Sequence, residues 1–179
     1  MEAMSVARDH EAVLWSDDVV VGFVGKTDFG VTNVWTQIAL RCFANCGLML
    51  LEDFNLATAK LAAWDYMNIT WNPETIIAAG IEAKWKTDTW PLSQCLALIE
   101  TSTLHISVKV HTVAQFLQLL RRSDCIEMNQ SAVIQATLNS LGDARAVRWI
   151  LRRLDHLFGI DIPSAEFVCL ELKYWLRLR

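Results

Sequence analysis

The glycines of one short segment are spaced as in loops that bind phosphate groups. Residues 19–35 read VVVGFVGKTDFGVTNVW and contain three of the chain's seven glycines. The segment lies between a predicted strand and a predicted helix, where glycines let the backbone approach a ligand and the helix N-terminus offers unpaired N–H groups. A candidate nucleotide site therefore comprises Gly22, Gly25, Lys26, Thr27, Gly30 and Thr32.

One template for this segment is the dinucleotide fingerprint G-x-G-x-x-G. Gly25 and Gly30 fit it, whereas Thr27 occupies the position of the middle glycine. Glu52 and Asp53 follow the next apolar run, about where an acid binds the ribose of the cofactor. The ten residues VGFVGKTDFG resemble the opening of the β-hydroxyacid dehydrogenase family. This resemblance implies NAD or NADP as the cofactor.

A second template is the P-loop, G-x-x-x-x-G-K-[ST], which binds the phosphates of ATP or GTP. Gly25, Gly30 and Thr32 fit it, but Val31 occupies the place of the lysine. Without that lysine the loop lacks the charge that holds the β- and γ-phosphates. A third interpretation is a strand-to-helix turn with no ligand. We favour the third and expect no cofactor, with a nucleotide, NAD or NADP as the alternative.

Tryptophan is unusually frequent in this chain, which has eight. Four of them lie between residues 64 and 90, namely Trp64, Trp71, Trp85 and Trp90. Tryptophan is enriched at the energetic centres of protein interfaces, although it also fills cores. We expect these four residues to contribute to an interface.

Basic residues are concentrated in the C-terminal half. Residues 1–90 hold 12 acidic and 6 basic side chains, whereas residues 91–179 hold 8 acidic and 10 basic ones. Arg145, Arg148 and Arg152 share one face of a predicted helix beside Trp149, a combination that suits single-stranded nucleic acid. Because acidic residues are interleaved with these arginines, we favour a solvated or partner-facing surface. We expect no specific binding of nucleic acid at physiological salt.

Hydrophobic periodicity predicts a mixed α/β fold, with α+β as the alternative. A β-branched run at 18–24, a helix at 31–45 and an apolar run at 48–51 form an N-terminal strand–turn–helix–strand unit. The C-terminal half is predicted to be helix-rich. Helices are predicted at 56–66, 73–84, 113–122, 132–141 and 144–158. Alternating apolar residues predict a strand at 104–110 and favour one at 167–178, where a helix fits as well.

The length of 179 residues fits a single domain, 1–179, in which residues 1–16 form a loose arm. Five scattered cysteines argue against a disulfide framework and for free thiols in a reducing compartment. Cys42 and Cys46 are four residues apart, but no further ligand lies near them, so we expect no metal site. No apolar run reaches the roughly 18 residues of a membrane span, and the first residues lack a signal peptide's apolar block. We expect an intracellular protein, cytoplasmic or nuclear, with no membrane contact.

High apolar content bears most directly on function. Hydrophobic residues make up 53% of the chain and charged residues 20%, a balance typical of a large core or of a surface covered by a partner. No complete catalytic constellation is recognisable. We therefore expect a non-catalytic protein-binding or assembly module that forms homo-oligomers or binds another protein. The alternatives are a nucleotide- or dinucleotide-binding protein that uses residues 22–32, and nucleic-acid binding through the C-terminal arginines.

Overall fold

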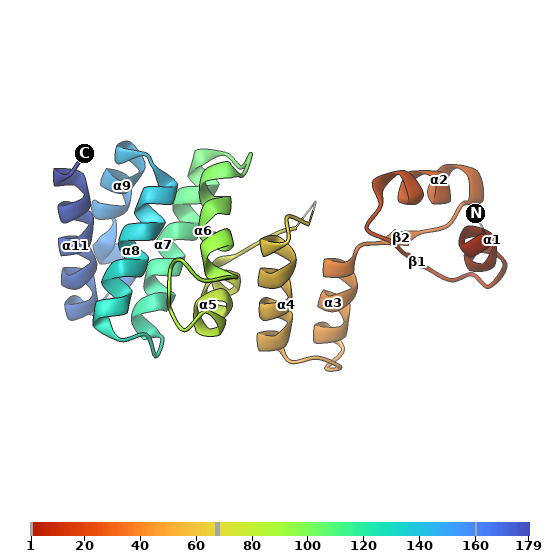
Figure 1. Ribbon diagram of the computed structural model, residues 1–179, viewed down its shortest axis with the longest axis horizontal. Coiled ribbons are helices and arrows are strands. Elements are labelled where there is room, and N and C mark those ends of the chain that lie inside the picture. Colours follow the sequence, from red (N-terminus) through yellow and green to blue (C-terminus); the bar gives the residue numbers. More distant parts are fainter. Residues whose placement is uncertain (1, 67–68, 160) are drawn as a thin grey trace. The chain divides into compact units, whose positions relative to one another are not determined.

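Helices account for most of the chain (Figure 1). The computed structural model describes residues 2–66, 69–159 and 161–179. Within these ranges the strands are limited to two short ones, β1 and β2. The chain divides into unit 1, Met1–Phe54, and unit 2, Asn55–Arg179, and the boundary falls within helix α4 (Leu51–Ala63).

Unit 1 is built on a small parallel crossover. β1 (Leu14–Trp15) and β2 (Asn33–Val34) pair in parallel, with Leu14 opposite Asn33. Helix α2 (Val19–Phe29) connects the two strands, and α1 (Glu2–Asp9) packs on α2 and β1. Helix α3 (Thr36–Asn45) follows β2. Residues 2–9, within the segment expected to be a loose arm, thus form a helix with two buried residues, Met4 and Ala7.

Residues 18–24 begin a helix, so the strand predicted there is wrong. The Asp18 carboxylate caps α2 by accepting hydrogen bonds from the N–H groups of Val20 and Val21, at 2.8 and 3.1 Å. Gly30 ends the helix with φ +68°, a left-handed conformation that glycine adopts without strain. These caps satisfy terminal backbone groups of an 11-residue helix, and they outweigh the β propensity of three successive valines.

The rest of the predicted N-terminal unit is confirmed in part. The helix predicted at 31–45 is α3, which begins only at Thr36 because β2 occupies the residues before it. The strand implied by the apolar run at 48–51 is not formed. Residues 46–50 make the turn between α3 and α4, and Leu51 begins α4.

Unit 2 is a stack of helices in two layers. In chain order they are α5 (Pro73–Glu82), α6 (Leu92–Thr101), α7 (Ile106–Arg122), α8 (Glu127–Leu141), α9 (Ala144–Leu151), α10 (Leu154–Phe158) and α11 (Ile162–Arg177). α5 packs on α7, α6 on α8 and α7 on α9, while α11 packs on α8, α9 and α10. Because α5, α7 and α9 pack in succession, as do α6, α8 and α11, the arrangement resembles the stacked helix pairs of α-solenoids.

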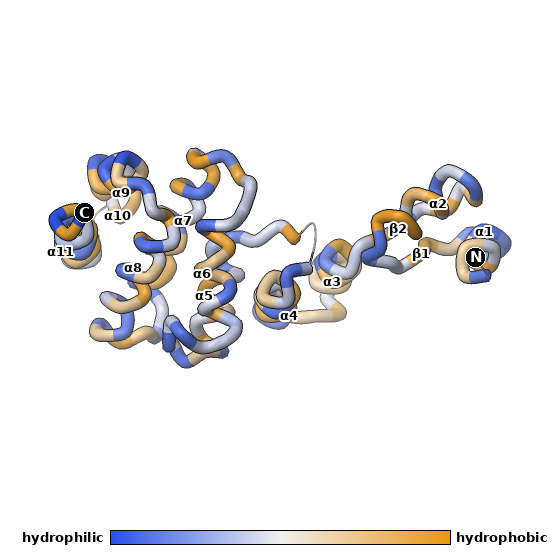
Figure 2. Tube along the Cα trace, turned by 45° about the horizontal axis from the view of Figure 1, so that its top comes forward, coloured by the Kyte–Doolittle hydropathy of each residue, from blue (hydrophilic) through white to orange (hydrophobic). Residues whose placement is uncertain are grey.

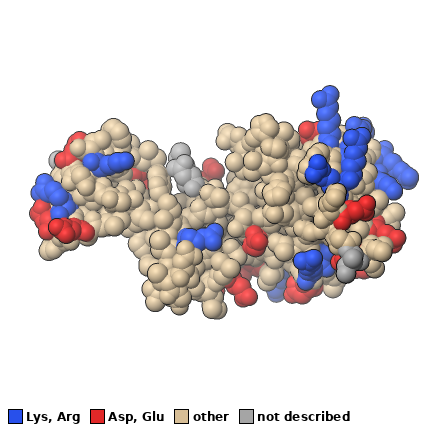
Figure 3. Space-filling view, turned by 180° about the vertical axis from the view of Figure 1, so that it is seen from behind, with Lys and Arg blue, Asp and Glu red and all other residues tan. Residues whose placement is uncertain are grey.

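The core of unit 2 lies between these helices. Its largest fully buried side chains include Ile76, Leu92, Ile99, Phe116, Leu117, Leu120, Ile134, Leu138, Ile150 and Leu172. Orange and blue positions alternate along the helices in Figure 2, and the charged side chains lie on the outer surface in Figure 3. Burial of one such apolar side chain contributes about 1.5–3 kcal/mol, so the packing of apolar faces stabilises the stack.

The strand predicted at 104–110 is also wrong, because most of this segment belongs to α7. The alternating residues Ile106 and Val108 are 40% and 46% exposed, so the alternation does not mark a buried face. The buried side of α7 instead runs through Val110, Val113 and Leu117 at helical spacing. Alternation over seven residues is outweighed by a longer helical stripe that packs on α5, α8 and α9.

The segment at 167–178, where alternation favoured a strand, is helical. Val168, Leu172 and Trp175 are the buried residues of α11 in this range, and their spacings of four and three residues are those of a helix. The other helices predicted after residue 55 are confirmed as α4, α5, the second part of α7, α8 and the α9–α10 segment. The helix-rich C-terminal half is therefore confirmed, and α6 is the helix that periodicity did not predict.

Candidate protein-binding surfaces

The glycine-rich segment packs α2 against the two strands. A Cβ built on Gly22 would lie 2.7 Å from Nδ2 of Asn33 in β2, and one on Gly25 would lie 3.4 Å from Cδ2 of Leu14 in β1. The lack of a side chain at Gly22 therefore lets α2 lie close to Asn33, whereas a Cβ on Gly25 would make an ordinary van der Waals contact with Leu14. Gly22 serves this packing, Gly25 is buried beside β1, and Gly30 ends the helix.

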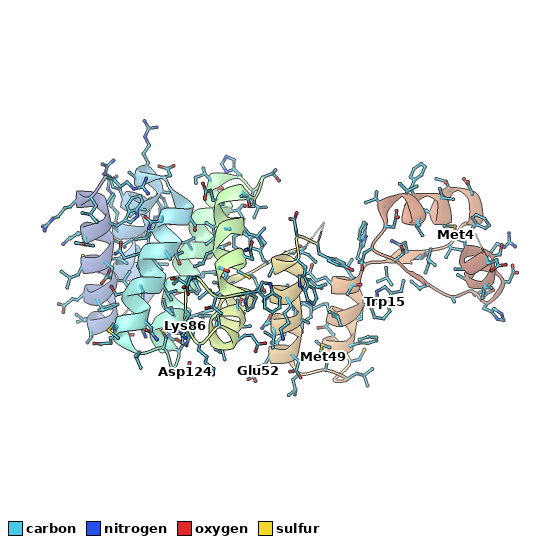
Figure 4. The ribbon with its side chains drawn as sticks, viewed as in Figure 1. Met4, Trp15, Met49, Glu52, Lys86 and Asp124 are labelled. Atoms are coloured by element: carbon cyan, nitrogen blue, oxygen red, sulfur yellow. The ribbon has the colours of Figure 1, made fainter. Side chains whose placement is uncertain are left out.

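The glycine-rich segment does not form the turn between a strand and a helix that a phosphate-binding loop requires, because most of it lies within α2. Lys26 and Thr27 lie within α2, where backbone N–H groups are used in helical hydrogen bonds. Gly30 and Thr32 lie at the C-terminal end of α2, which presents carbonyl groups and the negative end of the helix dipole. Both features disfavour a phosphate. Glu52 (labelled in Figure 4) and Asp53 are exposed in the first turn of α4.

The opposite side of α2 is apolar and exposed. Val19, Val20 and Phe23 are 50%, 68% and 67% exposed, and we call these three residues the α2 face. Their spacing places them within about 100° around the helix. Lys26, which is also exposed, follows Phe23 by one turn. A helix that is apolar on all sides is normally covered on all sides, so the α2 face is a candidate contact surface.

Trp64 and Trp90 form an exposed aromatic pair, which we call the indole pair. Their ring centroids are 5.7 Å apart and their planes are inclined by 33°. Trp64 is 64% exposed and Trp90 is 39% exposed. Trp71 is half-buried against the core of unit 2, and Trp85 is buried within it. Of the four tryptophans predicted to form an interface, the indole pair is thus the part most available to a partner.

Helix α11 also carries apolar side chains on two sides. Opposite its buried side lie Leu170, Tyr174 and Leu178, which are 67%, 56% and 66% exposed, and we call these residues the α11 face. A pocket of about 500 Å³ lies beside it, between α11 and the α9–α10 segment. Its lining combines apolar side chains with Asp155, Glu166 and Lys173, and it includes Leu170 of the α11 face.

The three arginines of the predicted basic face are accessible to solvent. Arg145, Arg148 and Arg152 are all exposed along α9 and its C-terminal cap, and no ion pair of the described residues involves them. The Arg153 guanidinium lies 4.7 Å from the centre of the Trp149 ring. Figure 3 shows Lys and Arg side chains gathered over one end of the C-terminal helices. This face can attract an anionic partner.

No protein-family model, curated protein or solved structure matches this chain. None of the described helices is long and apolar enough to cross a lipid bilayer. The described ranges also hold no group of three or more His, Cys, Asp or Glu side chains that could bind a metal ion. Function is therefore inferred from the three apolar surfaces and the basic face.

The five cysteines differ sharply in environment. Cys42 and Cys46 are exposed on and next to α3. Burial raises the pKa of the Cys95 thiol to about 12. Burial, and then the negative charge of Asp124 (Figure 4), raise the pKa of Cys125 to about 11. Cys95 and Cys125 are therefore protonated at neutral pH, where the thiol is a poor nucleophile.

The α2 face and the α11 face were not found from the sequence, although both left a signal there. Asp18 and Gly30 stand on either side of VVVGFVGKTDF as a helix N-cap and C-cap. Leu170, Tyr174 and Leu178 are spaced by four residues, a spacing that also fits a helix surface. Interpretation of the first segment as a buried β-branched strand, and of the second as an alternating strand, concealed both faces.

Proposed function

We propose that this chain is a non-catalytic protein-binding and assembly module. The observation that carries the proposal is the indole pair, in which Trp64 and Trp90 contact each other in a tilted arrangement while they are 64% and 39% exposed. Tryptophan contributes disproportionately to protein–protein affinity because it buries a large rigid surface with little loss of conformational entropy. Solvent-exposed tryptophans held together on one surface are therefore a suitable anchor for a protein.

Further features of the structure support this proposal. The α2 face and the α11 face add six more exposed apolar side chains to the indole pair. Contiguous apolar patches on soluble proteins commonly mark sites of protein interaction. Stacked helices such as those of unit 2 also form rigid scaffolds for binding surfaces. The buried, protonated thiols of Cys95 and Cys125 offer no activated nucleophile.

Sedimentation equilibrium between about 1 and 100 µM protein tests the proposal. We expect a mass above that of one chain that rises with concentration. The double variant Trp64→Ala/Trp90→Ala should associate at least tenfold more weakly, because truncation of one hot-spot tryptophan costs about 2 kcal/mol. Met128→Ala is the matched control, since Met128 is 76% exposed on α8 and belongs to none of the three apolar surfaces. An unchanged association constant in the double variant would contradict the proposal.

A further inference from the structure

We infer that the protein assembles head to tail, with the α2 face of one copy docked on the α11 face and adjoining pocket of the next copy. This inference rests on the proposed assembly function and names the partner and the surfaces. It places Val19, Val20 and Phe23 of one chain against Leu170, Tyr174 and Leu178 of another. The indole pair is not part of this contact.

The first argument is that α2 is covered on only one side. Its glycine side lies against β1 and β2, where a Cβ on Gly22 would lie 2.7 Å from Asn33 Nδ2 and Gly25 is buried beside Leu14. Phe23, on the other side, is 67% exposed. Exposure of a phenylalanine beside two valines is unfavourable in water, and burial of the three side chains would stabilise any complex that covers them.

The second argument is that α11 presents a matching surface. Its buried side packs on α8, α9 and α10, while the α11 face remains exposed. In stacked-helix proteins an outermost helix normally has a polar outer surface, which keeps the stack from extending by further association. The pocket beside the α11 face is concave and of about 500 Å³, and apolar Leu151, Leu154 and Leu170 contribute to its lining. A protruding side chain such as Phe23 suits this shape.

Charge identifies a second copy as the partner. Unit 1 holds eight acidic and three basic residues, whereas residues 144–179 hold seven basic and four acidic ones. Docking of α2 on α11 therefore brings the net negative unit 1 of one copy toward the net positive C-terminal segment of the next. Contact between two α2 faces or between two α11 faces would instead bring together segments of like net charge. The complementarity favours unlike surfaces in the contact, and both are present on the same chain.

Local charges agree with this pairing. Lys26 lies one turn after Phe23 on α2, and Asp155 and Glu166 line the pocket beside the α11 face. The lining also includes Lys173, so a lysine that enters with Phe23 would meet two carboxylates and one ammonium group, a net charge of −1. Because the contact joins different surfaces, each copy keeps one free α2 face or α11 face after pairing, and the assembly grows into a ring or an open filament.

Complementary variants test the inference, all of them built on the Trp64→Ala/Trp90→Ala parent so that the indole pair does not contribute. The first variant adds Val20→Glu/Phe23→Glu and removes the α2 face. The second adds Leu170→Glu/Tyr174→Glu and removes the α11 face. The third, a control, adds Ile126→Glu/Met128→Glu, two residues that are 60% and 76% exposed. Circular dichroism checks that each variant is folded, and the milder changes Phe23→Ser and Leu170→Ser replace any that is not.

The expected sedimentation masses are specific. The parent and the control should form assemblies larger than two chains, and each face variant alone should sediment as one chain, an at least hundredfold loss of association. An equimolar mixture of the two face variants should give two chains, because one intact α2 face meets one intact α11 face.

A mixture that stays at one chain would overturn the head-to-tail contact, as would a parent that is monomeric or a face variant that still assembles. The effect of Trp64→Ala/Trp90→Ala on the otherwise unchanged chain judges the proposed function separately.

Discussion

The indole ring of Trp85 lies directly against the α-carbon of Gly80. A Cβ built on Gly80 would overlap Cζ3 and Cε3 of this ring. Trp85 follows α5 with φ +59°, and its N–H donates a hydrogen bond to the Gly80 carbonyl at 2.8 Å. The missing side chain at Gly80 thus allows the chain to fold back on α5 and bury the indole to 8% exposure.

Replacement of Gly80 by alanine should therefore destabilise the protein. Alanine is the better helix former by about 1 kcal/mol, but the overlap forces Trp85 from its place, and we expect a net loss of about 1–3 kcal/mol in the free energy of unfolding. Urea denaturation measures it. In a Trp85→Leu background the same substitution should cost much less, because the two residues are in contact and their effects are coupled. Equal costs in the two backgrounds would refute this packing.

Arg121 is the second position at which we expect a large effect. Its guanidinium donates hydrogen bonds to the Gln130 side-chain carbonyl and to Ser164 Oγ, the latter at 3.4 Å, and lies 4.4 Å from the centre of the Phe167 ring. It thereby joins α7, α8 and α11, with its side chain only 12% exposed.

Arg121→Met should lower the free energy of unfolding by about 1–3 kcal/mol, because it leaves the buried Gln130 carbonyl without this donor and removes the cation–π contact. The neighbouring Arg122 is exposed, and Arg122→Met should change stability by no more than about 0.5 kcal/mol. Chemical denaturation of both variants provides the comparison. Similar losses in the two would show that Arg121 has no special structural role.

Cys95 should make stability depend on alkaline pH. Burial raises its pKa from 9.0 to about 12, so the folded protein holds this proton at pH values where the unfolded chain releases it. The contribution is fully present below pH 9 and is lost as pH rises from 9 toward 12. The difference in unfolding free energy between wild type and Cys95→Ala, measured in urea with a reductant, should be constant below pH 9 and shrink above it. A difference independent of pH up to 11 would contradict the raised pKa.

Nucleotides should not stabilise the protein. A ligand present at a hundredfold excess over its Kd stabilises the folded state by about 2.7 kcal/mol, which for a domain of this size is a melting shift on the order of 5–10 °C. Because the glycine-rich segment forms α2 rather than a loop, we expect no shift with millimolar ATP, GTP, NAD or NADP in differential scanning fluorimetry. A shift that disappears in Lys26→Ala would restore the nucleotide-binding alternative.

Local signals in the sequence were sufficient to predict most helices of unit 2. Pro73 suits the first turn of a helix and marked the start of α5. The structure adds a capping box there, in which Asn72 and Thr75 exchange hydrogen bonds. The apolar stripe through Val147 and Ile150 likewise predicted α9. Helix caps join residues that are close in sequence, and periodicity is a pattern within one segment. Both can therefore be recognised from the sequence alone.

Only the tertiary structure decided which apolar residues are covered. Gly22 and Gly25 belong to a segment whose glycines suggested a phosphate-binding loop. Their place in the fold follows instead from their positions beside Asn33 and Leu14, which belong to separate elements. Leu170 and Leu172 are equally apolar and two residues apart, yet one is 67% exposed and the other is fully buried. Burial depends on neighbours that the chain brings together from distant positions, and periodicity of a single segment carries no information about those neighbours.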